Sequence, residues 1–507
     1  MLFRSLVAEK QTQVAQEQKQ VADEQKQLAE QQRQVAEAAK KQADENAKVA
    51  NDQAGLALST MQILIDKVQK QLEDAPRTQK LKRELLETAM AGLKEVAKKA
   101  EGSTSIEATM LAAHIRMGYM FRQLGATEEA MKEFTLSYEV AKRRTASNPN
   151  NDASQANLAA VLSVLGEMTQ ELRRDMIAAL DCFEQSLKIL EDLHQRPRST
   201  EGAIGQDSVT QSLAEAQTRV GVTILRLGDP AKALPSFERA HLLREQLAEK
   251  HPESEPVQQD LARSYNAIGE VTFLLGKTAE ARNHYDRCLK LREGMLQAKP
   301  DNVRFKVELM NTSGNYGDLC LRSRDQAAAK THYDRTHSLA EELVALDDQN
   351  IEYRRSLATA LYRLGVWTDR AQMPEAAAPL LARCLELREN IAAIDAKNEI
   401  WQMDLILALA RCGQHQRAAT TAEAARAGKK DRELLFNIAR GYAQCAASTA
   451  ASDKSLSDTY VAAAIAALRD AIAEGYHDRV TFQSEPDLDP LRDHSEFQAM
   501  AQTLEKQ

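Results

Sequence analysis

Few residues in this sequence have both the types and the spacing that catalysis or metal binding requires. The string GKT that begins at Gly276 looks like the end of a phosphate-binding loop, but such a loop needs its first glycine where Val271 stands. His332 and His337 are five residues apart, so they do not share a helix face as metal ligands four residues apart would. We therefore expect no catalytic residue, no metal site and no cofactor.

The six cysteines show no C-x-x-C spacing. Cys288 and Cys384 occupy a position of the repeating pattern described next where Ala240 stands in another unit. A small buried residue belongs there, so we expect packing thiols in a reducing compartment. The cysteines are Cys182, Cys288, Cys320, Cys384, Cys412 and Cys445.

A sequence pattern repeats every 48 residues, and the elements that it predicts must position any functional residue. Each unit has a glycine, an alanine twelve residues later and a bulky apolar residue sixteen residues later. A small residue lets two helices approach closely, and the large residue fills the neighbouring gap, so the pattern predicts packed helical hairpins. The units are Gly221, Ala233 and Phe237; Gly269, Ala281 and Tyr285; Gly317, Ala329 and Tyr333; and Gly365, Ala377 and Leu381.

Two earlier units extend the array. Gly118 leads to Ala130 and Phe134 at the same offsets, whereas Gly166 reaches Phe183 one residue late. The delay predicts a small insertion near Arg173.

The reversal between the two helices of a unit falls seven residues after its first glycine. Gly125, Gly228 and Gly276 stand there and accept a positive φ without strain. Arg324 and Gln372 replace glycine in later units, which predicts another turn geometry for those units.

This pattern resembles the tetratricopeptide repeat, in which L-G-x2-Y is followed by A-x3-F within roughly 34 residues. The L-G pair appears as Leu165-Gly166 and Leu364-Gly365. The resemblance implies an all-α, right-handed α-solenoid of tetratricopeptide-type helical hairpins. The 48-residue period exceeds the usual one by about 14 residues, which predicts elongated hairpins with a deeper groove. Twelve prolines, 5% aromatic residues and the absence of long β-branched alternation agree with an all-α chain.

The N-terminal residues 1–54 form a different segment, rich in Gln and Ala and without Gly or Pro. Apolar residues recur every seven positions along a predicted long N-terminal helix, as at Val14, Val21, Leu28, Val35 and Val49. Because the stripe is narrow and flanked by Gln and Glu, a dimeric coiled coil and a solvated single helix both remain open.

The other predicted parts of the chain follow from composition and period. We expect a capping helical hairpin at 55–104, six elongated repeats at 105–397, shorter irregular repeats at 398–475, and a C-terminal turn and capping helix at 476–507. In the last part, Leu488, Leu491 and Phe497 are the expected anchors.

The N-terminal stalk, the string DAPRTQKLKRELLETA and the terminal string PDLDPLRDHSEF together resemble the region after the kinase domain in planctomycete-like Hanks-type serine/threonine kinases. The H-R-D and D-F-G strings of a kinase are absent from this sequence. In such kinases the region follows a membrane-spanning helix and acts in sensing or docking. The resemblance implies a regulatory region of a split or truncated kinase, either cytoplasmic or tethered to a membrane through a missing upstream segment.

A net charge of −8 and the lack of a basic stripe argue against a nucleic-acid partner. The leading hypothesis is a non-enzymatic scaffold that binds a protein or peptide segment in its groove, with self-association through the N-terminal helix. The kinase-associated region is the alternative, and an enzyme with an unrecognised site is the third hypothesis.

The tetratricopeptide resemblance implies that the first helix of each hairpin lines the concave surface, so polar residues near each repeated glycine are the candidates for the groove. They carry both signs of charge and do not match a clamp for a terminal carboxylate, which would combine Lys, Asn and Arg with little acid. The candidates are Tyr119, Arg122, Arg263, Asn266, Glu270, Asn311, Asp318, Arg322, Tyr362 and Arg370.

Overall fold

The computed structural model describes residues 26–28, 30–46, 49, 53, 107–123, 126–196, 204–427 and 431–506. Throughout these residues the regular structure is helical and contains no strand, which confirms the predicted all-α fold with a long N-terminal helix. The predicted capping hairpin at 55–104, the heptad positions Val14 and Val21, and Gly125 lie outside the described residues. The five-part division of the chain stays a prediction.

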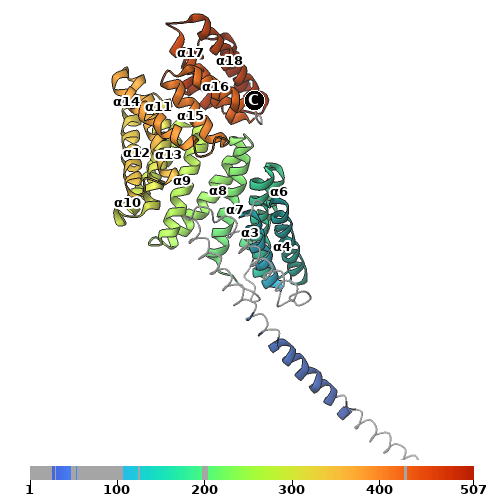
Figure 1. Cartoon of the computed structure of the whole chain (residues 1–507). Coiled ribbons are helices and arrows are strands. Elements are labelled where there is room, and N and C mark those ends of the chain that lie inside the picture. Colours follow the sequence, from blue (N-terminus) through green and yellow to red (C-terminus); the bar gives the residue numbers. More distant parts are fainter. Residues whose placement is uncertain are drawn as a thin grey trace, which may run out of the picture. The chain divides into compact units, whose positions relative to one another are not determined.

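The chain divides into two compact units, and we describe each by itself. The first unit comprises residues 1–189 and 196–204. Its helices are α3 (Glu107–Gln123), α4 (Thr127–Ser147), α5 (Asp152–Met168) and most of α6 (Met176–Gln195). Figure 1 shows these helices in blue-green.

The insertion predicted near Arg173 is a single π-helical turn. Thr169–Arg173 continue α5 as the π-helix η1, and Arg174 then takes a left-handed φ of 55° before α6 begins. An extra residue inside a helix is accommodated as such a turn without breaking the helix. The delay between Gly166 and Phe183 therefore arises in the turn, as the sequence indicates.

The second unit comprises residues 190–195 and 205–507 and contains the longer run of hairpins. Figure 1 shows α10, α12 and α14 in a row along one side, with α9, α11 and α13 beside them. Its elongated hairpins are α7 (Gln206–Arg226) with α8 (Pro230–Lys250), α9 (Glu255–Leu274) with α10 (Thr278–Ala298), α11 (Val303–Arg322) with α12 (Gln326–Leu346), and α13 (Ile351–Arg370) with α14 (Pro374–Ala392). Shorter elements follow: α15 (Glu399–Arg411), α16 (His415–Arg426), α17 (Arg432–Thr449), α18 (Lys454–Ala473), α19 (Arg479–Ser484), the 3-10 helix η2 (Pro486–Leu491) and α20 (Ser495–Lys506).

The repeated glycines are the points where a ring from the second helix of a hairpin lies against the first. A Cβ built at Gly317 would lie 2.6 Å from Cε1 of Tyr333, and one built at Gly269 would lie 3.3 Å from Cδ2 of Tyr285. Both tyrosines are buried. The glycine and the bulky residue sixteen positions later thus form one packing contact, because only a glycine leaves room for the ring.

The turns at Arg324 and Gln372 correct one sequence prediction. Arg324 has a φ of 63° and Gln372 one of 59°, in the same left-handed region as Gly276 at 75°. The three turns also share their hydrogen bonds. The N–H of the left-handed residue donates to the carbonyl oxygen three residues earlier, as from Arg324 to Leu321. The N–H of the following residue donates to the carbonyl oxygen five residues before it, as from Asp325 to Cys320. Because these bonds satisfy the last carbonyls of the first helix, they hold a non-glycine residue in the strained conformation.

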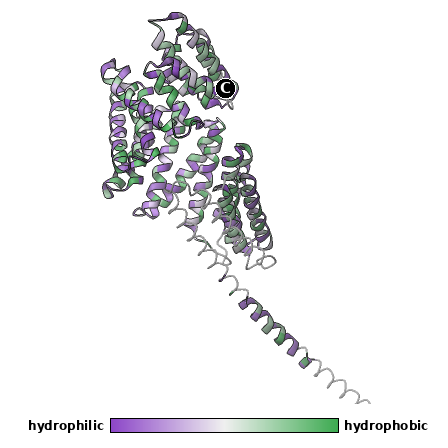
Figure 2. Ribbon diagram, viewed as in Figure 1, coloured by the Kyte–Doolittle hydropathy of each residue, from purple (hydrophilic) through white to green (hydrophobic). Residues whose placement is uncertain are grey.

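The described part of the N-terminal segment is helical and exposed at residues 26–28 and 30–46. Figure 2 shows apolar and polar residues alternating along this helix. Leu28, Val35 and Val49 are 56%, 69% and 56% exposed. The apolar stripe therefore has no cover from the described parts of its own chain. No helix among the described residues is long and apolar enough to cross a membrane.

Candidate functional site

The main site of the second unit is formed where the chain's own C-terminal segment crosses the first helices of the hairpins. We call residues 476–492 the C-terminal strap; it contains α19 and η2. Side chains on α11, α13, α15 and α17 all bind it. Leu488 and Leu491 of the strap and Phe497 of α20 are buried, as expected for anchors.

Asp487 is the centre of these contacts. Its carboxylate is 1% exposed and accepts a hydrogen bond from the Tyr362 hydroxyl at 2.7 Å. Nη2 of Arg411 donates to Oδ1 at 2.6 Å, and Nη2 of Arg440 donates to Oδ2 at 2.6 Å. The Gln444 side chain also donates to the Asp487 carbonyl oxygen at 2.7 Å. The carboxylate is thus fully paired despite its burial.

The electrostatics of this cluster follow from burial and from charge pairing. Burial alone would raise the pKa of Asp487, but the Arg411 and Arg440 guanidiniums outweigh it and hold that pKa well below its usual range. Burial, followed by the Asp487 charge, raises the pKa of the Tyr362 hydroxyl. Asp487 is therefore ionised and Tyr362 is a neutral donor at any physiological pH.

Glu485 and Asp489 extend the pattern along the strap. Glu485 pairs with Nη2 of Arg440 at 3.0 Å and with Nη2 of Arg322 at 3.2 Å. Asp489 forms an ion pair with Arg370 at the end of α13. Acids at alternate positions of the strap are thus bound by arginines from successive hairpins.

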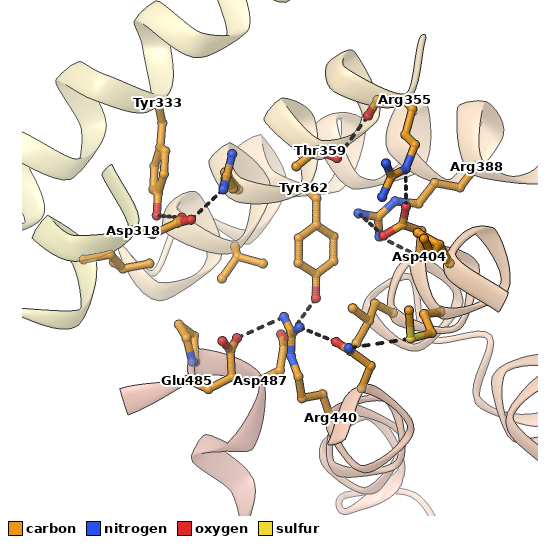
Figure 3. Close-up of a pocket in the computed structure, with 18 of the residues that line it drawn as sticks. Asp318, Tyr333, Arg355, Thr359, Tyr362, Arg388, Asp404, Arg440, Glu485 and Asp487 are labelled. Carbon is orange, nitrogen blue, oxygen red and sulfur yellow. Dashed lines mark hydrogen bonds and ion pairs between the residues drawn. The ribbon is translucent and has the colours of Figure 1, made fainter. Parts of the chain in front are cut away.

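A cavity of about 330 Å³ remains beside the strap. Figure 3 shows Tyr362 pointing across it toward Asp487, with Arg388 and Asp404 on one side and Asp318 on another. Asp318 accepts hydrogen bonds from Arg363 at 2.6 Å and from the Tyr333 hydroxyl at 2.8 Å.

Arg388 belongs to a second repeated pattern, in which a buried arginine precedes an acid by sixteen residues. Arg388 Nη1 donates to the Asp404 carbonyl oxygen at 2.7 Å, and Arg292 makes the equivalent bond to Glu308. In the intervening unit both residues are absent, and Ala340 stands in the arginine position. The pattern links the second helix of one hairpin to the first helix of the next.

Three of the predicted groove residues contact the strap from α11 and α13, namely Arg322, Tyr362 and Arg370. Asp318 lines the cavity. Glu270 on α9 is exposed.

The other predicted residues do not join this site. Arg263 pairs with Asp260 at 3.0 Å and is exposed, and Asn311 is exposed on α11. Asn266 accepts a hydrogen bond from the Thr312 hydroxyl at 3.2 Å.

Two predicted residues lie in the first unit, where they make packing contacts. The Tyr119 ring lies edge-on to Phe134, with 5.2 Å between the centroids. Arg122 pairs with Glu171 at 3.2 Å. The role of all ten residues in partner binding stays a prediction.

Sequence reasoning missed Arg411, Arg440, Glu485 and Asp487. One signal was available for Arg411, which lies two residues before the turn residue Gly413, as Arg322 and Arg370 lie two residues before the turn residues Arg324 and Gln372. For Asp487, the string PDLDP indicates only a turn. No periodicity indicates which distant helices such a turn contacts.

A further contact closes the second unit on itself. Arg432, at the start of α17, donates to the carbonyl oxygens of Arg226 and Leu227 at the end of α7. It also donates to the Gly475 carbonyl oxygen at 3.0 Å, directly before the strap. The α7–α8 hairpin and the α17–α18 hairpin thus meet where the strap begins.

Nothing in the described residues resembles a metal site, since no group of three or more His, Cys, Asp or Glu is placed to hold an ion. The cysteines are free thiols, and Cys288, Cys320, Cys384 and Cys445 are buried. Burial raises the pKa of Cys445 to about 12. These thiols fill space in the core.

A family model described as tetratricopeptide repeat matches residues 212–294. Among curated proteins, no sequence matches significantly. The apo form of RapI is similar in structure, with a TM-score of 0.52 and 12% identity, and the match covers 83% of this chain and 99% of that one. The apo quorum sensor NprR from B. thuringiensis matches with a TM-score of 0.46 and 12% identity over 82% and 99% of the two chains. At these identities the similarity concerns the fold alone.

Proposed function

We propose that this tetratricopeptide-repeat protein is a non-enzymatic scaffold that binds a protein or peptide segment on the first helices of its second unit. One observation carries the proposal: these helices already bind an irregular segment of the chain itself, the strap, through side chains of four hairpins. A surface that recognises acids and apolar anchors along one segment has the chemistry to recognise another.

We place the partner on exposed residues of these first helices that make no described contact with the strap. Arg263 on α9 and Asn311 on α11 are exposed, and the 330 Å³ cavity continues the surface toward α13 and α15. Arg322 is unsuitable as a probe of partner binding, because its substitution would also remove two contacts to the strap.

Site-specific crosslinking tests the proposal. A photoreactive residue at Arg263 or Asn311 should capture the same partner segment in native cells. The same residue at the exposed Ala327, on the second helix α12, should capture none. The purified segment should then bind the full chain with an affinity that Arg263→Ala and Asn311→Ala reduce. Equal capture from Ala327, or unchanged affinity in both variants, would contradict a groove-bound partner.

We further propose that the N-terminal helix mediates self-association. Leu28, Val35 and Val49 expose an apolar stripe at multiples of seven residues, which a second copy of the helix would cover. Sedimentation should give a dimer for the full chain and a monomer when all three residues are changed to Gln. A monomeric parent chain at high micromolar concentration would refute this role.

The alternative function, a regulatory region for a serine/threonine kinase, draws support from one coincidence. The string PDLDPLRDHSEF, on which the resemblance to kinase-associated regions depends, overlaps the strap and contains Asp487. A kinase gene directly upstream, together with a change in the activity of that kinase when the chain is added, would favour this alternative. No effect on the kinase would eliminate it.

A further inference from the structure

The residues that line the cavity beside the strap carry one more positive charge than negative charge. Its described lining includes five arginines, namely Arg322, Arg355, Arg363, Arg388 and Arg440, and four carboxylates, namely Asp318, Asp404, Glu485 and Asp487. A buried charge without a counterion is costly, so an unmatched arginine in a cavity indicates a missing anion.

The excess positive charge lies at Arg388 and Arg355, which share the single carboxylate of Asp404. The Arg388 side chain is 5% exposed, and the nearest paired carboxylate oxygen, Oδ1 of Asp404, is 3.9 Å from Nη2. The same carboxylate instead accepts a hydrogen bond from Nε of Arg355 at 3.0 Å. Among the described residues, Nε of Arg388 has no hydrogen-bond acceptor, and the same is true of Nε of the equivalent Arg292. The other four arginines each have a carboxylate oxygen within 3.2 Å.

The surroundings of Arg388 define a compact site. Its guanidinium lies 4.5 Å from the centroid of the Tyr362 ring, which fixes its plane. Ile400, 49% exposed, and the partly buried Met403 also line the cavity and supply apolar contacts toward solvent. A volume of about 330 Å³ is at the lower end of the roughly 300–1,000 Å³ typical of ligand sites, so the cavity has room for an acidic side chain.

We infer that this cavity binds one carboxylate, supplied by an acidic side chain of the partner segment, on Arg388 and Arg355. The inference rests on the proposed scaffold function and names the chemistry of its ligand. The strap offers the precedent, since its Glu485 and Asp487 place acidic side chains among arginines of the same helices.

Small probes of matched shape test the assignment on the full chain. Acetyl-glutamate amide carries a side-chain carboxylate, and acetyl-glutamine amide is its neutral analogue. Acetyl-leucine, with a free terminal carboxylate, represents the other source of the same group. We expect binding of the glutamate probe at least tenfold tighter than that of the glutamine probe, with a shift of the Met403 methyl NMR signal, which reports from the cavity wall.

Matched variants separate binding from folding. Arg388→Gln should abolish the preference for the carboxylate, and Arg355→Gln, which removes a partly exposed side chain, should weaken it. Arg292→Gln removes the equivalent arginine of another repeat, which does not line this cavity, and should leave probe binding unchanged. If Arg388→Gln fails to fold, Arg355→Gln and the Met403 signal decide the question.

The outcomes distinguish this inference from the scaffold proposal. Equal binding of the glutamate and glutamine probes, or an unmoved Met403 signal, would overturn the carboxylate site even if a partner is captured at Asn311. Binding of acetyl-leucine alone would overturn the assignment to an acidic side chain. Binding of the glutamate probe by a chain that captures no partner segment would support the site and count against the scaffold.

Discussion

Nε and Nη2 of Arg411 both donate to Oδ1 of Asp487, at 2.8 and 2.6 Å, and join the end of α15 to the strap. Arg440 holds the other oxygen of the same carboxylate. Two guanidiniums from different hairpins thus depend on one acid of the C-terminal segment.

Asp487→Asn should therefore lower the free energy of unfolding by about 3 kcal/mol, because two buried arginines lose the carboxylate that they share. Among the residues that the structure describes, Arg411 then keeps only Asp369 as an ion-pair partner, and Arg440 keeps only Glu485. Urea denaturation of the full chain measures the loss. Asp489→Asn is the matched control, since Asp489 is 47% exposed in its pair with Arg370 and its loss should cost at most about 1 kcal/mol. Similar losses in the two variants would contradict the central role of Asp487.

The contribution of Asp487 should also depend on pH. Its folded-state pKa lies below that of an unfolded aspartate, about 3.9, so its stabilisation is present above that value and is lost as the pH falls toward the folded-state pKa. The stability difference between the parent and Asp487→Asn should be constant from pH 7 to pH 5 and should shrink below about pH 4. A difference that does not change down to pH 3 would refute the ion pairing.

The contact between repeated glycines and rings predicts opposite effects at two glycines. Gly317→Ala should destabilise the protein by about 1–3 kcal/mol, because the new Cβ would meet the Tyr333 ring at 2.6 Å. Gly294, within α10, has no atom within 4 Å of such a Cβ, so Gly294→Ala should stabilise the protein by about 0.5–1 kcal/mol. Thermal and urea unfolding of both variants provide the comparison. If both substitutions destabilise the protein, contact with the neighbouring helix does not explain why glycine is needed at position 317.

The left-handed turn residues make a second pair of opposite effects. Arg324→Gly should stabilise the protein by about 0.5 kcal/mol, because glycine accepts the φ of 63° without the side-chain strain. Gly276→Ala should destabilise it by about 1 kcal/mol at the equivalent position. Urea midpoints of the two variants measure these changes, and a loss of stability in Arg324→Gly would contradict a shared turn geometry.

The sequence predicts the hairpins well because their determinants are local and repeated. Gly317 and Tyr333, sixteen residues apart, specify a contact that occurs in every elongated unit. It predicts the strap poorly because the partners of Asp487 are distant, with Tyr362 lying 125 residues earlier. An acid in a turn carries no local signal of the arginine that will bind it. The same reasoning explains Arg324, whose left-handed turn is imposed by hydrogen bonds that the residue type alone does not indicate.

The bonds from Arg432 to the Arg226 and Leu227 carbonyls have an evolutionary consequence. Solenoids commonly change length by duplication or deletion of a unit, since each unit touches only its neighbours. Here an added hairpin between α8 and α16 would carry Arg432 away from α7. The copy number of hairpins in this stretch is therefore constrained, and homologues that gain or lose one should also lack an arginine at this position.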